Sequence, residues 1–123
     1  DVKDTEFNRF VVTDGTRTSI DPLMSKESYF HSFDIEGHRK IHSKQIICGY
    51  TCMEHDRLFV EENGPTLEVG DYIKYNKVGA YTMCLTPLFI KYFPDVYVET
   101  CGKMKKVRSA WTPHEFVQCS ELE

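Results

Sequence analysis

The chain has 123 residues, of which 41% are hydrophobic, and its formal net charge at pH 7 is −4. This length suits one domain that buries about two thirds of the surface of the unfolded chain, and the hydrophobic content argues against disorder. The acidic balance argues against nucleic acid as a partner, because such a partner usually requires a basic excess. Since no apolar run approaches the roughly 20 residues needed to cross a bilayer, we also expect no membrane partner.

The first half of the chain has the pattern of short strands separated by turns. Strands are predicted over residues 9–13, 29–33, 43–50 and 56–62. The first strand ends at the turn signal Asp14-Gly15, a turn is expected at Gly37, and residues 63–65 (Asn-Gly-Pro) are predicted to form another turn.

The second half continues the pattern and ends with a short helix. Residues 70–83 alternate and are predicted as strand, turn and strand, and two more strands are predicted over 95–102 and 105–110. Thr112 can cap a helix, Pro113 fits its first position and Glu115 completes a capping box. The predicted fold is therefore mainly β: a Greek-key-like sandwich or barrel of short strands with a short C-terminal helix, forming one domain over residues 1–123.

The cysteines indicate a reducing compartment. There are five of them, an odd number, and no two form a CxxC pair. We therefore expect free thiols and a cytoplasmic protein rather than a disulfide framework. Cys48 lies in an apolar run and is predicted to be an inert core thiol, whereas Cys84 and Cys101 are predicted to lie in strands and Cys119 lies near the C-terminus.

The stretch GYTCMEHD at residues 49–56 concentrates chemically active side chains, and three interpretations are open. A zinc site could use Cys52, His55 and Asp56, but tetrahedral sites normally need two ligand pairs. The histidines His38 and His42 do not supply the second pair, because residues four apart in an extended segment lie about 13 Å apart.

The second interpretation is a nucleophilic pair, in which His55 activates the Cys52 thiol; it needs a curled loop and an orienting third group. The third is a loop that carries a single acid. An ordinary thiol, with a pKa of about 8.5, is mostly protonated at neutral pH and can give its proton to a carbanion. The residues themselves do not identify what would generate that carbanion, so they leave the function open.

The order of the motifs resembles a known family. The segments FVVTDG, DPLM, ICGYTCMEHD, GPTLEVGDYI, VGAYT and FPDVYV follow one another along the chain. This series is similar to the C-terminal β-domain of the pyridoxal-phosphate-dependent amino-acid decarboxylases, the group with the diaminopimelate, ornithine and carboxynorspermidine enzymes. The resemblance covers roughly residues 9–98. Its most specific parts are Gly49, Cys52 and Asp56, then Gly70-Asp71, then Gly79-Ala80-Tyr81.

The resemblance implies a function that this chain completes only with other parts. In the family a (β/α)8 barrel holds pyridoxal 5'-phosphate on a lysine, and the β-domain packs against it in a homodimer with active sites at the interface. Carried over, Cys52 is the catalytic acid, which protonates the decarboxylated α-carbon in the partner subunit's site. Tyr81 binds the cofactor phosphate, and Asp56 fixes the loop. A chain without the barrel is expected to be inactive alone and to bind no cofactor.

The departures from the family concern the substrate. Met53 stands where the family usually has an acidic residue that binds the distal amine of a small amino-acid substrate, so Glu54, one position later, becomes the candidate substrate-binding residue. Asp21 stands where many members have an arginine, and we expect it to repel a carboxylate. Both changes argue against diaminopimelate or ornithine as the substrate. The alternative is a non-catalytic, decarboxylase-like regulatory or interaction module that retains the fold without the chemistry.

Overall fold

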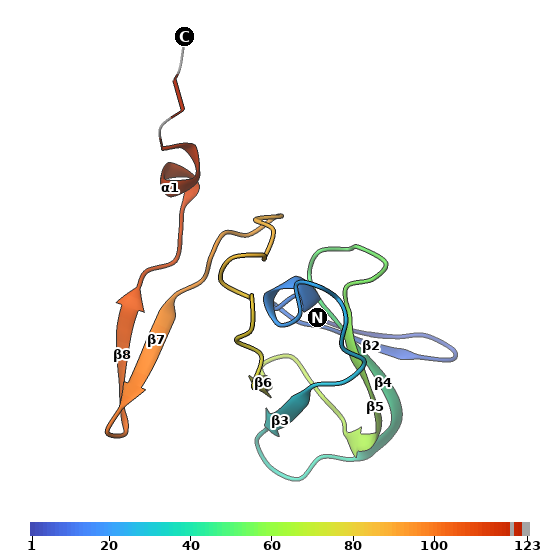
Figure 1. The fold of residues 1–123 in the computed structure, drawn as a ribbon. Helices are drawn as coiled ribbons and strands as arrows, with labels where there is room; N and C mark the ends of the chain where they lie inside the picture. Colours follow the sequence, from blue (N-terminus) through green and yellow to red (C-terminus); the bar gives the residue numbers. More distant parts are fainter. Residues whose placement is uncertain (119, 122–123) are drawn as a thin grey trace. The chain divides into compact units, whose positions relative to one another are not determined.

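The computed structural model describes residues 1–118 and 120–121, so Cys119 lies outside the described residues (Figure 1). The chain divides into two compact units, Asp1–Pro87 and Leu88–Glu123. The expectation of one domain over the whole chain stays a prediction.

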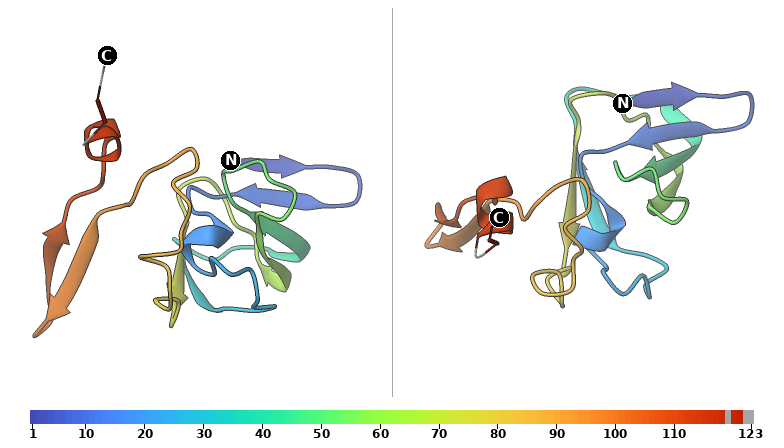
Figure 2. Two further views of the ribbon diagram at one scale, coloured as in Figure 1. Left: turned by 45° about the horizontal axis from the view of Figure 1, so that its top comes forward. Right: turned by 90° about the horizontal axis from the view of Figure 1, so that it is seen from above.

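The first unit is built on a four-stranded sheet. Its strands are β1 (Val2–Asp4), β2 (Arg9–Val12), β4 (Ile41–Cys48) and β5 (Arg57–Pro65), in the order β1-β2-β4-β5. Strands β2 and β4 are parallel, and the two outer pairs are antiparallel. The hairpin of β1 and β2 is seen from two directions in Figure 2. A second, antiparallel pair consists of β3 (Phe30–Asp34) and β6 (Tyr72–Asn76), and the short 3-10 helix η1 (Arg17–Ser19) follows β2.

The core of this unit lies around β4, where Ile46 and Ile47 are buried next to the fully buried Gln45. Consecutive buried positions mean that both faces of the strand are covered. Isoleucine suits such a strand, because β-branched side chains pack well in β-sheets. The Gln45 amide is satisfied, because its Nε2 donates to the carbonyl of Pro65 (2.8 Å) and its Oε1 accepts from the amide of Leu67 (2.9 Å). The buried core residues are Val11, Ile20, Tyr29, Ile47, Leu58 and Leu67.

Aromatic contacts connect the β3–β6 pair to the main sheet. The His31 ring of β3 stacks on Phe59 of β5 with a centroid distance of 4.0 Å, and Tyr75 of β6 meets Phe59 edge to face at 6.1 Å. Such pairs contribute about 0.5–1.5 kcal/mol beyond the area that they bury. The two β layers of the first unit are therefore held together by ring contacts.

The second unit consists of the hairpin β7 (Val96–Thr100) and β8 (Lys103–Arg108), followed by α1 (Pro113–Val117). Its turn is Cys101-Gly102, both with positive φ (50° and 73°), the conformation that two-residue hairpin turns require. The helix has the predicted cap: Thr112 accepts from the amide of His114, and Glu115 accepts from the amide of Thr112. In the described part of this unit, no residue is buried.

The prediction of a mainly β fold with a short C-terminal helix is confirmed. Within the described residues, the sheets do not close into a barrel. No helix in the part of the chain that the structure covers is long and apolar enough to span a bilayer.

Some local predictions are wrong. Residues 63–65 belong to β5 instead of a turn, although Asn63 does take the left-handed backbone (φ 54°) that its sequence signal suggests. The second strand predicted within residues 70–83 is absent from the described structure, because the chain leaves extended geometry at Lys77 (φ 58°) and Tyr81 (φ 63°). Cys84 lies in the turn that follows, and Cys101 lies in the hairpin turn, so neither is a strand residue.

Candidate functional site

The loop of residues 49–56 is fixed by one buried carboxylate. Asp56 is only 2% exposed, and its Oδ1 accepts hydrogen bonds from the amide of Arg17 (2.7 Å) and the hydroxyl of Thr16 (3.0 Å). Its Oδ2 accepts from the amide of Thr51 (3.1 Å) and from the Thr51 hydroxyl. Buried charge is costly unless it is fully hydrogen-bonded, and here both oxygens are occupied. Asp56 therefore holds the residue that immediately precedes Cys52.

Gly49 is required by the same carboxylate. A Cβ built at Gly49 would lie 2.2 Å from Oδ2 and 2.3 Å from Oδ1 of Asp56, closer than real Cβ atoms approach other atoms. The amide of Gly49 also donates to the carbonyl of Asp56 (2.8 Å), which closes the base of the loop. The spacing of Gly49, Cys52 and Asp56 thus has a physical reason: the glycine makes room for the anchor of the loop that carries the thiol.

Cys52 is exposed at the tip of this anchored loop and has a left-handed backbone (φ 58°). Its thiol makes only a long contact to the carbonyl of Tyr50 (3.8 Å). A cavity of about 310 Å³ is lined by this residue together with Met53 and Glu54. A thiol in this position can meet another molecule.

The residues beside Cys52 are exposed as well. Met53, Glu54 and His55 all face solvent, and a turn closes where the amide of Asp56 donates to the carbonyl of Met53 (3.0 Å). Over residues 1–118 and 120–121 there is no group of three His, Cys, Asp or Glu side chains that could hold a metal ion. Asp56 is committed to the loop, which removes the third ligand of the zinc interpretation.

The segment that carries Tyr81 is irregular and exposed. Tyr81 is 60% exposed, and its carbonyl accepts from the amides of Cys84 (3.2 Å) and Leu85 (2.9 Å). Among the described residues, no partner hydrogen-bonds the Tyr81 hydroxyl. Tyr81 is therefore not an aromatic residue of the core.

The helix η1 connects the two segments. On one side the amide of Arg17 is bonded to Asp56 in the Cys52 loop. On the other side the carbonyl of Thr18 accepts from the hydroxyl of Thr86 (3.0 Å), which follows the Tyr81 turn. Both views of Figure 2 show η1 beside the segment after β6. The structure does not bring Cys52 and Tyr81 into contact in one chain, but it fixes their segments to the same short helix.

Asp21 is a buried structural residue and does not face a ligand. It is 4% exposed, and its carboxylate accepts from the amide of Lys26 (2.9 Å) and the hydroxyl of Tyr29 (3.2 Å). Burial alone would raise the pKa of Asp21, but these hydrogen bonds and the Arg17 guanidinium at 3.6 Å hold it below its ordinary value. The expectation that Asp21 repels a substrate carboxylate is not supported, since its charge is already compensated inside the unit.

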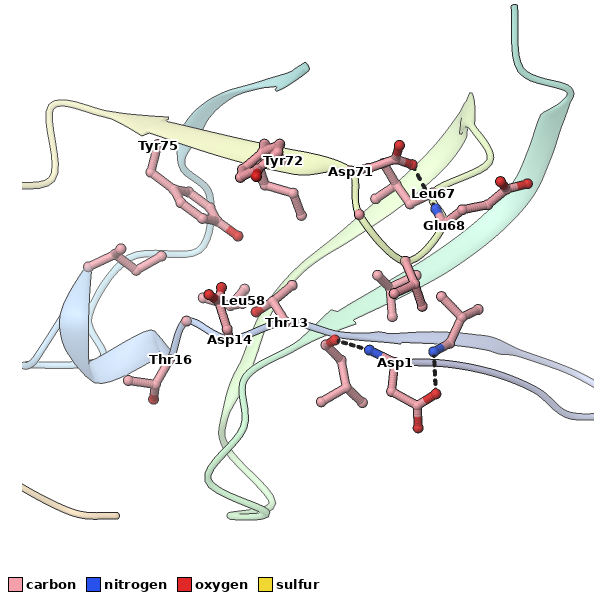
Figure 3. Close-up of a pocket in the computed structure, with 18 of the residues that line it drawn as sticks. Asp1, Thr13, Asp14, Thr16, Leu58, Leu67, Glu68, Asp71, Tyr72 and Tyr75 are labelled. Atoms are coloured by element: carbon pink, nitrogen blue, oxygen red, sulfur yellow. Dashed lines mark hydrogen bonds between the residues drawn. The ribbon is translucent and has the colours of Figure 1, made fainter. Parts of the chain in front are cut away.

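A larger cavity, of about 440 Å³, lies elsewhere in the first unit (Figure 3). Tyr75 points into it, and no described residue hydrogen-bonds its buried hydroxyl. Burial raises the pKa of Tyr75, and the nearby Tyr29 adds to the effect. Neither Cys52 nor Glu54 nor Tyr81 lines this cavity, so it is separate from the predicted site residues.

The sequence interpretation missed the residues that support the loop. Thr16, Arg17 and Thr51 bond to Asp56, and only the position of Thr51 within the loop motif hinted at such a role. Thr16 and Arg17 lie about 40 positions away along the chain, and no local pattern marks them as partners.

Comparison with known proteins establishes the fold. The sequence matches no protein-family model and no curated protein. A diaminopimelate decarboxylase structure aligns with a TM-score of 0.78 and 17% identity, over 95% of this chain and 31% of that one. Two structures of diaminopimelate decarboxylase from M. jannaschii, one of them in complex with L-lysine, align with a TM-score of 0.76 and 16% identity, over 100% of this chain and 28% of that one. The resemblance predicted from the motifs is thus confirmed at the level of fold: the chain has the fold of a part of diaminopimelate decarboxylase and spans less than a third of its length.

Proposed function

We propose that the chain is the C-terminal β-domain of a pyridoxal-phosphate-dependent amino-acid decarboxylase. Cys52 is its proton donor, Tyr81 binds the cofactor phosphate, and Glu54 contacts the substrate. The observation that carries the proposal is the Cys52 loop: a buried carboxylate anchors it, a glycine makes room for that anchor, and the thiol stands exposed at its tip. A structural cysteine needs no such support, because it is held by the core around it.

The exposed side chains of this chain would supply only part of a cofactor site. This agrees with the proposal that a second domain, the barrel, holds the cofactor. A phenol without an internal partner can donate a hydrogen bond to a phosphate oxygen, and Tyr81 presents one. Pyridoxal phosphate, when bound, stabilises the negative charge left on the α-carbon when CO2 departs. Tyr81 would orient the cofactor phosphate in its own subunit, and Cys52 would hold a proton at Sγ for the α-carbon in the partner subunit's site.

The residues next to the thiol limit the substrate. Met53 offers a thioether and no charge, whereas Glu54 is an exposed carboxylate lining the same cavity. A substrate amine that reaches this loop would therefore pair with Glu54. This residue lies one position after Met53, where the family usually has an acidic residue. The L-lysine complex of the M. jannaschii enzyme supports a small amino acid as the class of ligand.

The remaining parts come from outside the chain. The matched decarboxylases are more than three times as long, and the resemblance assigns the additional length to a barrel that carries the cofactor lysine. Segments near η1 expose apolar side chains that a partner would cover: Leu23, Met24, Met53, Tyr81, Met83 and Leu85. We propose the barrel and a second copy of the enzyme as these partners. The free thiols of Cys48, Cys52, Cys84 and Cys101 support a cytoplasmic location.

Cofactor binding separates this function from the non-catalytic alternative. In the complete protein that contains this chain, pyridoxal phosphate should bind and give a visible absorbance band. Tyr81→Phe should weaken that binding at least about 10-fold, because a hydrogen bond to a charged group contributes about 1.5–3 kcal/mol. Tyr72→Phe is the matched control, since Tyr72 is also exposed (73%) and should leave the affinity unchanged. A complete protein that binds no cofactor would favour the regulatory module.

A further inference from the structure

Two thiols border the cavity at the Cys52 loop. Cys48 ends β4, and Cys52 follows four residues later; both line the cavity of about 310 Å³. Cys84 and Cys101, the other cysteines that the structure describes, do not line it. The two side chains thus share one space, and the role proposed for the loop uses only one of them.

The two thiols differ in accessibility and are weakly held. Cys52 is exposed, whereas Cys48 is partly buried at the irregularity where the register of β4 and β5 shifts. Each thiol makes only a long contact to the carbonyl two residues before it, 3.7 Å for Cys48 and 3.8 Å for Cys52. Because S–H groups are weak donors, little energy holds either side chain in place. Burial raises the pKa of the Cys48 thiol, so this residue keeps its proton at neutral pH.

We propose that Cys52 and Cys48 form an oxidant-responsive pair, in which peroxide oxidises Cys52 and Cys48 then closes an intrachain disulfide. In the first step the Cys52 sulfur attacks hydrogen peroxide: an S–O bond forms, the O–O bond breaks, and the departing hydroxide leaves as water with the thiol proton. In the second step the Cys48 sulfur attacks the Cys52 sulfur, the S–O bond breaks, and hydroxide leaves as water with the Cys48 proton. Two thiols and one peroxide give one disulfide and two waters.

Closing this bond requires a local change in the loop. A disulfide requires Cα atoms about 4.4–6.8 Å apart, which three intervening residues can span when the chain bends. Asp56 holds Thr51, so the movement falls on Cys52 itself. Its φ of 58° lies in a region that L-residues seldom occupy, so a return to negative φ would relieve backbone strain as the side chain moves.

The disulfide is independent of the proposed enzyme function, but its consequence rests on that function. Once bonded to Cys48, Cys52 has no proton to donate. Oxidation would therefore stop the proposed proton delivery reversibly, because a thiol reductant restores both groups.

Mass spectrometry of the full chain tests the pair without any activity assay. Trypsin cuts after Lys44 and Arg57, so one peptide, residues 45–57, contains both cysteines. After treatment with hydrogen peroxide and then a thiol-alkylating reagent, we expect this peptide unalkylated and about 2 Da lighter than its reduced form, with both thiols recovered by dithiothreitol. In Cys48→Ser, Cys52 should instead be trapped as a sulfenic acid by dimedone, and in Cys52→Ser, Cys48 should remain alkylatable.

The control is Cys84→Ser, which should give the same light peptide as the wild type. Three results would overturn the proposal. They are over-oxidation of wild-type Cys52 with Cys48 still alkylated, disulfides that form only between chains, and no oxidation of either cysteine in the peptide. Because the readout is the mass of this peptide, failure of the pair would not be confused with failure of the decarboxylase proposal, which is read from cofactor binding.

Discussion

Replacing Asp56 with asparagine tests how the Cys52 loop is held. The carboxylate accepts four hydrogen bonds, two on each oxygen, from Thr16, Arg17 and Thr51. In the variant an NH2 group replaces one oxygen, and two of the four bonds lose their acceptor. A threonine hydroxyl can rotate and accept from the new amide. A backbone amide can only donate. The amide of either Arg17 or Thr51 would therefore face the new NH2 group and lose its hydrogen bond.

The expected cost follows from these bonds. A hydrogen bond to a charged group contributes about 1.5–3 kcal/mol, and an unsatisfied buried donor costs about 1–3 kcal/mol. We therefore expect Asp56→Asn to lower the free energy of unfolding by about 3 kcal/mol, a large share of the roughly 5–15 kcal/mol that stabilises a domain.

Urea unfolding followed by circular dichroism measures this loss, and hydrogen exchange of the Thr51 and Arg17 amides locates it. Glu62→Gln is the control, because Glu62 is an exposed residue of β5 and should change the stability by less than about 0.5 kcal/mol. A loss below about 1 kcal/mol in Asp56→Asn, with unchanged exchange at Thr51, would refute the view that this carboxylate anchors the loop.

Three further changes test other parts of the same framework. Gly49→Ala should lower the free energy of unfolding in urea by at least about 2 kcal/mol, because the new Cβ would lie 2.2 Å from Asp56 Oδ2. Gly79→Ala is the control, since the space around Gly79 is open, and it should have little effect. Equal effects of the two substitutions would contradict the steric explanation. The pKa of Asp21 is lower in the folded state than in the unfolded chain, so its contribution to stability is complete above about pH 4 and is lost as the pH falls through the folded-state pKa. Asp21→Asn should flatten the dependence of stability on pH in that acidic range, and an unchanged slope would count against this assignment. Thr86→Val removes the hydroxyl that donates to the carbonyls of Thr18 in η1 and of Thr82, and should speed amide exchange in residues 82–86 without affecting the Cys52 loop; unchanged exchange would show that this hydroxyl does not hold the segment.

The sequence was most informative where local chemistry decides the structure. The cap of α1 follows from Thr112, Pro113 and Glu115 alone, and the structure has it as predicted. The buried strand around Ile46 and Ile47 was predictable for the same reason, since a continuous apolar run needs cover on both faces.

Non-local pairing explains the failures. Asn63 carries a turn signal and takes the turn-like φ, yet residues 63–65 remain in β5, where Gly64 and Pro65 are register partners of β4. The partner strand overrides the local preference, which is a tertiary effect that no single segment reveals. Conversely, residues 77–83 are predicted to form a turn and a second strand, but no neighbouring strand pairs with them in the described structure and they remain irregular.

The candidate site divides in the same way. The family resemblance implied that Asp56 fixes the loop, and the structure shows the bonds by which it does so. The motif could not reveal that Thr16 and Arg17 supply half of those bonds, nor that Thr86 connects the Tyr81 segment to the same helix, because these contacts join residues about 40 and 68 positions apart.

The most direct test of the proposed function is the effect of Cys52→Ala in the complete protein that contains this chain. With pyridoxal phosphate bound and the amino-acid substrate identified by screening, the variant should form the decarboxylated amine at least about 100-fold more slowly, the usual loss when a positioned acid is removed. Folding and cofactor affinity should not change, because Cys52 is exposed and Tyr81 is intact. Unchanged turnover and an unchanged product would show that the proton comes from another group, and would contradict the role assigned to the Cys52 loop.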